Sequence, residues 1–161
     1  MLLTSRCYAV TGLGYMPPWA VNAGFVVGSS VTLVVDSGPS TAAARTIHGY
    51  AASVRPSNGL RVVNTEKHFD HVGGNGFFAS AGAEIWAHRL AVRSEAEFLA
   101  EIEEFNRAIP DPVRRARGEA GVFFHDSALT NPSYTIDCDT TIDLGDCPAQ
   151  ILLTPGHTAT N

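Results

Sequence analysis

The sequence predicts a layered α/β protein (α/β or α+β), because short β-branched segments alternate with longer stretches of helix-forming residues. Residues 31–35 and 60–64 are typical of buried strands, whereas residues 40–54 are typical of a helix. A chain of 161 residues is long enough for one domain and too short for two ordinary ones. With 45% apolar and 17% charged residues, the composition is typical of a globular chain and not of a disordered one.

The N-terminal third is predicted to contain strands, a loop and one helix. Glycine and proline positions separate these segments into a strand over 7–10, a loop over 12–19 and a hairpin of strands 22–27 and 31–35. Ser40 can accept a hydrogen bond from the first helical turn, so the helix is expected to begin there and to end near residue 54.

The rest of the chain is predicted to continue the alternation. Its expected elements are a strand over 60–64, a short helix over 75–80, a strand over 84–87, a helix over 89–107, two strands around a turn within 135–146, and a strand over 150–154. In the longer helix, Leu90, Phe98, Ile102 and Phe105 lie close to one helical face, which is expected to be buried.

Charge and composition argue against several classes of protein. Eleven basic and sixteen acidic residues give a net charge of −5, whereas a nucleic-acid-binding surface must neutralise phosphates. The apolar runs are far shorter than the roughly 20 residues that a membrane helix needs. The N-terminus lacks a signal-peptide pattern. We therefore expect no nucleic-acid partner, no membrane partner and a cytoplasmic location.

The three cysteines are expected to be free thiols in a reducing compartment. Their number is odd, and their density is far below that of a disulfide scaffold. A pair between Cys138 and Cys147 across a hairpin is the alternative.

Four potential metal ligands follow the strand at 60–64: Glu66, His68, Asp70 and His71. Residues two apart in an extended segment share a face, so the first three could converge. A solvated turn with local hydrogen bonds would explain an isolated motif equally well. The position at the end of a buried strand favours a site, because layered α/β folds place their sites there. Another apolar run, 151–153, ends in a Pro-Gly turn that holds His157 at a second strand end.

The order of these motifs resembles the metallo-β-lactamase-fold superfamily of metallohydrolases. The resemblance rests on four segments, which are Asn-Ala-Gly-Phe at 22–25, Val-Val-Asp-Ser-Gly at 34–38, His-x-Asp-His-x-Gly-Gly at 68–74 and Thr-Pro-Gly-His-Thr at 154–158. It extends over nearly the whole chain, from about residue 22 to residue 157. It implies an αββα sandwich with a metal site at one edge of the sheets.

The resemblance also implies a set of ligands for one or two metal ions, with zinc as the expected metal. The first metal would be bound by Glu66, His68 and His157, and the second by Asp70 and His71. Asp36 matches a residue that supports the site from a neighbouring strand.

The chain departs from the family pattern in two places. The first motif position is usually His and is Glu66 here. A carboxylate is a harder ligand than an imidazole, so it shifts the expected metal preference toward iron or manganese. Family members also continue past the second motif, with a metal-bridging Asp in many members and a final His ligand. The chain stops at Asn161, so residues 1–161 are expected to be the N-terminal part of such a domain.

The implied function is hydrolysis of a small-molecule substrate (an ester, thioester, lactone or lactam) by a metal-bound hydroxide. Asp70 would bind the second metal and orient the nucleophile, which makes it the candidate catalytic residue. One alternative is a catalytically silent half-domain with weak or no metal binding. Another is an iron-dependent oxidoreductase of the same superfamily. The sequence leaves the oligomeric state open.

Several other residues are weaker candidates. The loop 15–19 matches a flap over the site, although Trp19 could equally pack in the core. The arginines at 114, 115 and 117 could bind an anion, but a solvated basic helix end is the simpler interpretation. The histidines at 48, 88 and 125 are assigned surface or core roles.

Overall fold

The computed structural model describes residues 1–16, 19–116, 124 and 127–161. In chain order its elements are β1 (Cys7–Met16), β2 (Trp19–Val27), β3 (Val31–Val35), α1 (Thr41–Val54), β4 (Gly59–Val63), α2 (Phe69–Val72), α3 (Asn75–Ser80), β5 (Glu84–His88), the 3₁₀ turn η1 (Arg89–Ala91), α4 (Glu95–Ala108), α5 (Asp111–Ala116), β6 (Tyr134–Ile136), β7 (Thr140–Asp143) and β8 (Pro148–Ile151). In this part of the chain, no helix combines the length and apolar character needed to cross a membrane.

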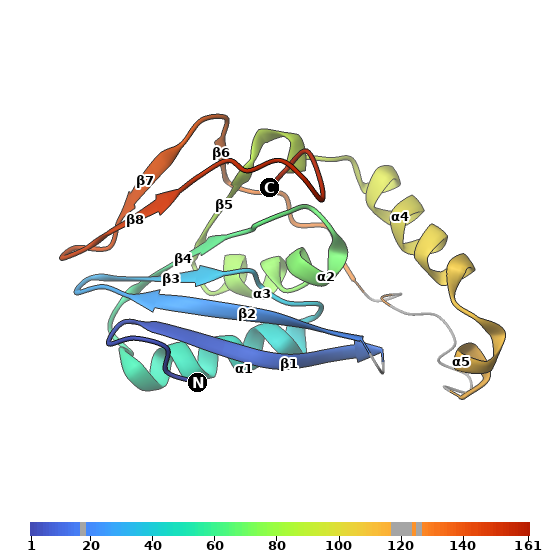
Figure 1. Ribbon diagram of the computed structural model, residues 1–161, viewed down its shortest axis with the longest axis horizontal. Helices are drawn as coiled ribbons and strands as arrows, with labels where there is room; N and C mark the ends of the chain where they lie inside the picture. Colours follow the sequence, from blue (N-terminus) through green and yellow to red (C-terminus); the bar gives the residue numbers. More distant parts are fainter. Residues whose placement is uncertain (17–18, 117–123, 125–126) are drawn as a thin grey trace.

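Six strands form a mixed sheet in the order β1-β2-β3-β4-β5-β6 (Figure 1). The first three strands pair antiparallel, whereas β3, β4, β5 and β6 pair parallel. A separate antiparallel pair, β7 and β8, forms a second sheet. Parallel strands end at one common edge, so the segments that follow β3 and β4 lie close together there.

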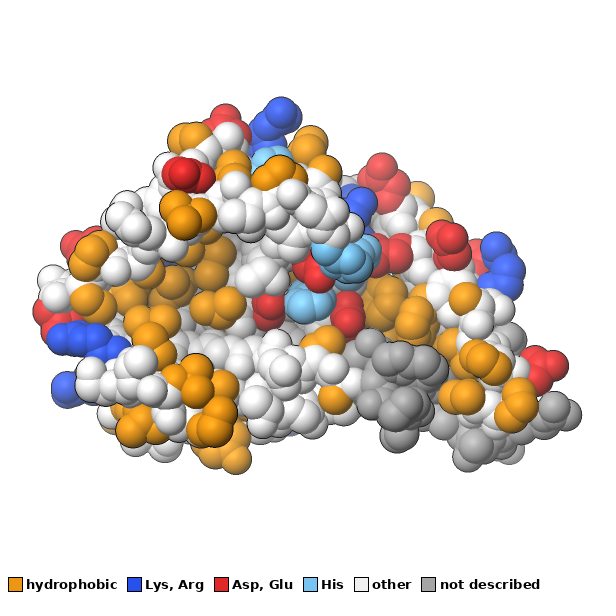
Figure 2. Space-filling view, viewed as in Figure 1, with side chains coloured by type: hydrophobic (Ala, Val, Ile, Leu, Met, Phe, Trp, Pro, Cys, Tyr) orange, Lys and Arg blue, Asp and Glu red, His pale blue; other side chains and the backbone are white. Residues whose placement is uncertain are grey.

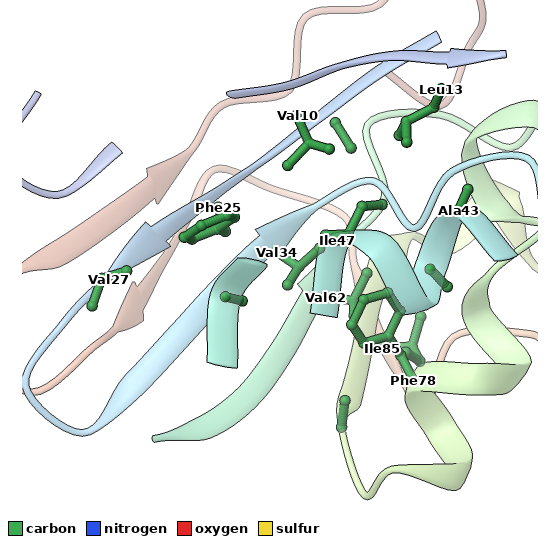
Figure 3. Close-up of a cluster of buried hydrophobic side chains, with 14 residues drawn as sticks. Val10, Leu13, Phe25, Val27, Val34, Ala43, Ile47, Val62, Phe78 and Ile85 are labelled. Carbon is green, nitrogen blue, oxygen red and sulfur yellow. The ribbon is translucent and has the colours of Figure 1, made fainter. Parts of the chain in front are cut away.

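Each face of the large sheet has its own apolar core. Neighbouring residues of β3 point to opposite faces, so Val34 packs with the helices and Leu33 packs with the second sheet. On the helical side, Ile47 of α1 and Phe78 of α3 are fully buried (Figure 3). On the other side, Leu144, beside the second sheet, is also fully buried. This arrangement confirms the predicted layered α/β class.

The first strand is longer than predicted, and the loop expected at 12–19 was wrong. β1 continues to Met16 and β2 begins at Trp19. The register shifts between Val10 and Leu13, which marks an irregularity at Gly12, where φ is +73°. The Gly12 amide donates to Asn22 Oδ1 at 3.2 Å. A bulge therefore lets a glycine-rich segment stay in the sheet.

The two strands predicted within 135–146 both form, but they belong to different sheets. β6 joins β5 in the large sheet, whereas β7 pairs with β8 in the second sheet. The predicted helix over 89–107 is divided into η1 and α4, because Ser94 starts a new helix with a capping box that includes Glu97. Phe98 and Ile102 are buried as expected, while Leu90 lies on the separate turn and is exposed. All three cysteines are free.

Candidate metal centre

The candidate ligands lie at the edge of the large sheet where the parallel strands end. Glu66 and His68 follow β4, and His71 lies on α2. The segment that follows β8 returns to this edge, where His157 lies close to Glu66. Figure 2 shows histidine and acidic side chains gathered together on this face. The fold therefore brings together two motifs that are far apart in the sequence.

Three side chains form a compact group of donor atoms: Glu66, His68 and His157. One ligand atom from each lies within 4.8 Å of the other two. Glu66 Oε2 is 2.5 Å from His68 Nδ1 and 3.5 Å from His157 Nε2. The glutamate side chain is only 7% exposed, whereas the His157 side chain is 70% exposed. The group thus has a buried carboxylate at its base and an open imidazole at its rim.

The chemistry of this group fits a divalent cation. Glu66 Oε2 is buried and has no hydrogen-bond partner among the described residues, although His68 Nδ1 is close to it. A buried charged oxygen that accepts no hydrogen bond is costly unless a positive group lies beside it. Two imidazoles and one carboxylate are ligands that zinc accepts. A cation among the three donors would satisfy the oxygen.

Asp36 supports this centre from the end of β3. Its backbone has a φ of +62°, an uncommon conformation for a residue other than glycine. Its carboxylate accepts hydrogen bonds from the Thr65 amide and hydroxyl, each at 2.8 Å, and its Oδ2 is 2.9 Å from His71 Nδ1. Asp36 therefore fixes both the start of the ligand loop (residues 65–71) and the orientation of His71.

His71 lies between two carboxylates. Its Nδ1 contacts Asp36, and its Nε2 is 3.1 Å from Glu66 Oε1. Burial of the imidazole disfavours its charge, but the hydrogen bond to Asp36 and the charges of Asp36, Asp70 and Glu66 outweigh burial and raise the pKa of His71 to about 9. In the metal-free chain, a proton on His71 therefore compensates part of the negative charge at the centre.

We expect the metal-free chain to lose stability at alkaline pH. The pKa of His71 rises from 6.5 to about 9 on folding, so its contribution is complete below pH 6.5 and is lost as pH rises through 9. Denaturant unfolding with a chelator present should show a decrease of about 2–3 kcal/mol across this range. Asp36→Asn keeps a residue that tolerates positive φ, and it should weaken the pH dependence. An unchanged pH dependence in this variant would contradict the assignment.

Asp70 lies next to His71 on α2 and is half-buried. It is not part of the three-residue donor group, and its charge contributes to the raised pKa of His71. Its predicted roles as a second-metal ligand and as the residue that orients the nucleophile stay predictions.

Asn161 joins the loop that contains His157 to the ligand loop, a role that was not predicted. Asn161 Nδ2 donates to the Thr65 carbonyl at 3.3 Å, and Asn161 Oδ1 accepts from the Thr158 amide at 2.7 Å. The Thr154 amide also donates to the Asn161 carbonyl at 3.0 Å. Asn161 therefore holds His157 and Glu66 on facing loops. The Thr-x-Thr-Asn sequence after His157 was the available signal, since asparagine often closes such turns.

Two further sets of hydrogen bonds that hold the ligand loop in place were not predicted. The Arg93 guanidinium donates to the Lys67 carbonyl at 2.5 Å, between the ligands Glu66 and His68. Asn64 and Asn75 exchange hydrogen bonds of 3.1 and 2.9 Å, which join the end of β4 to the start of α3. Asn64 and Asn75 occur at both ends of the ligand segment in the sequence, but only the fold shows that they meet. Both asparagines are buried, so the pair has no competition from solvent.

Glycines let the ligand segment closely approach the segment 37–39, which follows β3. A Cβ atom on Gly73 would lie 2.5 Å from the Pro39 carbonyl oxygen, and one on Gly74 would lie 2.3 Å from the Ser37 carbonyl oxygen. Ser37 in turn donates through its hydroxyl to the His71 carbonyl at 3.1 Å. The paired glycines predicted to permit a turn therefore also permit this contact.

The model of one known protein family matches most of this chain. The model of the metallo-beta-lactamase superfamily matches residues 16–160. The chain belongs to this superfamily. The predicted metallo-β-lactamase fold is thereby confirmed, and the described residues form three layers of its αββα sandwich: α1 with α3, the six-stranded sheet, and the β7–β8 sheet.

Solved structures of superfamily members share the fold at low sequence identity. A subclass B3 metallo-beta-lactamase, MEM-A1 from a soil metagenome library, has a TM-score of 0.59 and 19% identity, over 96% of this chain and 52% of that one. A metallo-beta-lactamase from Cronobacter sakazakii has a TM-score of 0.56 and 19% identity, over 88% and 49%. The alkylsulfatase Pisa1 from a Pseudomonas species has a TM-score of 0.62 and 16% identity, over 99% and 28%.

The chain thus spans about half the length of these metallo-beta-lactamases and less of the alkylsulfatase. A search of curated proteins gives no match. The prediction that residues 1–161 are the N-terminal part of a superfamily domain stays a prediction.

The weaker candidates from the sequence either lie outside the described residues or have contacts of another kind. The flap residues 17–18, Arg117 and His125 lie outside the described residues, as do the side chains of Trp19, Arg114 and Arg115. His48 packs edge-on against Phe77, and His88 caps η1 through its Nδ1. These two histidines thus have the structural roles that were assigned to them.

Proposed function

We propose that this chain forms the metal-binding part of a metal-dependent hydrolase that acts on a small organic substrate. The proposal depends on one observation, the convergence of Glu66 Oε2, His68 Nδ1 and His157 Nε2. Superfamily membership supports it, because the similar structures include a metallo-beta-lactamase and an alkylsulfatase. The proposed substrate contains a hydrolysable carbonyl group, as in an ester, thioester, lactone or lactam.

The proposed roles follow from the contacts of each side chain. Glu66, His68 and His157 would hold the cation, and Asp36 keeps His71 oriented through its Nδ1. Zinc is the proposed metal, as one or two ions, and iron or manganese is the alternative that the glutamate oxygen favours. A bound cation of this kind polarises a substrate oxygen and lowers the pKa of a coordinated water. Asp70, beside His71, is proposed to orient the attacking water.

The second candidate function is a catalytically silent half-domain with weak or no metal binding. It is supported by Glu66, a carboxylate at the motif position where the family usually has a histidine ligand. A cytoplasmic location is also proposed, because the three cysteines are free thiols.

Metal binding is the first experimental test. We expect the chelator-treated chain to bind at least one equivalent of Zn²⁺ in calorimetric titration, with Fe²⁺ and Mn²⁺ as parallel titrants. His68→Ala should weaken binding by more than about 100-fold, because a direct ligand matters more than an outer partner. His48→Ala, which removes a histidine that packs against Phe77 and is not part of the donor group, is the matched control and should bind as the parent does. Zinc binding that is equally weak in all three proteins would contradict the proposed function.

Hydrolysis is the second experimental test, and it separates the two candidate functions. The zinc-loaded chain would be offered a chromogenic β-lactam, a glutathione thioester and a lactone. The hydrolase proposal predicts turnover of one of them, with loss on chelation. Weak or no metal binding, together with no turnover of any of them, would instead favour the silent half-domain.

A further inference from the structure

The Glu66 carboxylate faces imidazoles on two sides, with a different oxygen toward each. Oε2 lies 2.5 Å from His68 Nδ1 and 3.5 Å from His157 Nε2. Oε1 lies 3.1 Å from Nε2 of His71. The side chain is 7% exposed, and Oε2 has no hydrogen-bond partner among the described residues. One buried carboxylate thus contacts two separate sets of nitrogen donors.

The contact between His71 and Oε1 has a defined chemistry. His71 Nδ1 is 2.9 Å from Asp36 Oδ2, and this contact favours the tautomer with its proton on Nδ1. The neutral ring then directs the lone pair of Nε2 toward the carboxylate, which also has only lone pairs to offer. Two acceptors this close repel unless a positive species lies between them. A metal cation bound by Nε2 and Oε1 would remove the repulsion.

We propose that Glu66 bridges two cations, one held with His68 and His157 and the other held with His71. This inference rests on the proposed function, and it assigns the two oxygens of one residue to different ions. Asp70, next to His71 on α2, is the nearest residue in sequence that could complete the second site. A histidine at position 66 could not form this bridge, because an imidazole of usual geometry presents only one nitrogen to a shared site.

Three single substitutions distinguish a bridge from two independent sites. His157→Ala should lose the first cation and keep the second, and His71→Ala should do the reverse. Glu66→Ala should weaken both, by about 10- to 100-fold or more at each. Glu66→His should keep one tightly bound cation, because it replaces only one of the two oxygens with a donor. Calorimetric stoichiometry with Zn²⁺ measures each case, and circular dichroism of each metal-free variant shows that it is folded.

Manganese provides a readout that does not depend on affinity. A carboxylate bridge places two Mn²⁺ ions close together, so their electron spins couple and the resonance spectrum differs from that of isolated ions. We expect this coupling in the parent chain and its loss in Glu66→His. A parent chain that binds only one ion would overturn the bridge while leaving the proposed function in place. Glu66→Ala with one site at parental affinity would also overturn it, whereas a parent chain that binds no metal would overturn the proposed function itself.

Discussion

Replacing Arg93 with methionine is expected to lower the free energy of unfolding by about 3 kcal/mol, because it removes one partner of a largely buried ion pair. The side chain of Arg93 is 8% exposed, and its guanidinium contacts Glu101 and lies 4.8 Å above the ring of Phe98. Glu101 Oε1 is already buried without a hydrogen-bond partner among the described residues. Without the arginine, the negative charge of Glu101 would remain in a poorly solvated position. Urea denaturation of the metal-free chain measures the change.

Two control variants show whether the buried charge is the cause. Arg107→Met removes an exposed arginine of α4, where it pairs with Glu103 and both side chains are more than 70% exposed. That change should cost less than about 0.5 kcal/mol. The double variant Arg93→Met/Glu101→Leu should recover most of the loss, since paired apolar side chains replace a buried ion pair well. A single variant as stable as the parent would contradict the prediction.

Replacing Gly74 with alanine is expected to destabilise the chain by about 3 kcal/mol, because the new methyl group has no space. The Cβ atom would lie 2.3 Å from the Ser37 carbonyl oxygen and 2.6 Å from Ala44 Cβ on α1. Both neighbours belong to the rigid framework of the sheet edge and its covering helix. The clash would also shift α2, which contains His71, so thermal unfolding and zinc titration should both report the change.

Gly49→Ala is the matched control, because it adds the same methyl group at a glycine with open surroundings. Gly49 lies inside α1, and its Cβ atom would have no neighbour within 4 Å. Alanine there should raise the free energy of unfolding by about 0.5–1 kcal/mol, since glycine lowers helix stability. Equal effects from the two substitutions would show that close packing at Gly74 is not the reason for its presence.

Local sequence patterns predicted the structure correctly where the residues of one segment determine its conformation. Ser40 accepts from the Ala43 amide and begins α1, as expected from its hydroxyl. The hairpin of β2 and β3 forms around Gly28, and β4 ends where the ligand motif begins. Predictions failed where pairing with a distant segment decided the outcome. The segment with Gly12 stays in β1 because β2 pairs with it. Local patterns also did not indicate that β6 joins β5 instead of the adjacent β7.

The layered α/β class and the candidate ligands of the metal centre could be predicted from the sequence alone. Alternating hydrophobicity fixes which faces are buried, and the spacing of Glu66, His68 and His71 identifies potential ligands. The family resemblance already implied that His157 and Glu66 share a site. The contact of Asp36 with His71 Nδ1, and the contacts by which Arg93 and Asn161 brace the ligand loops, appear only in the folded chain. These contacts join residues far apart in the chain, and their geometry depends on the packing of the two sheets. Local sequence patterns do not encode that geometry.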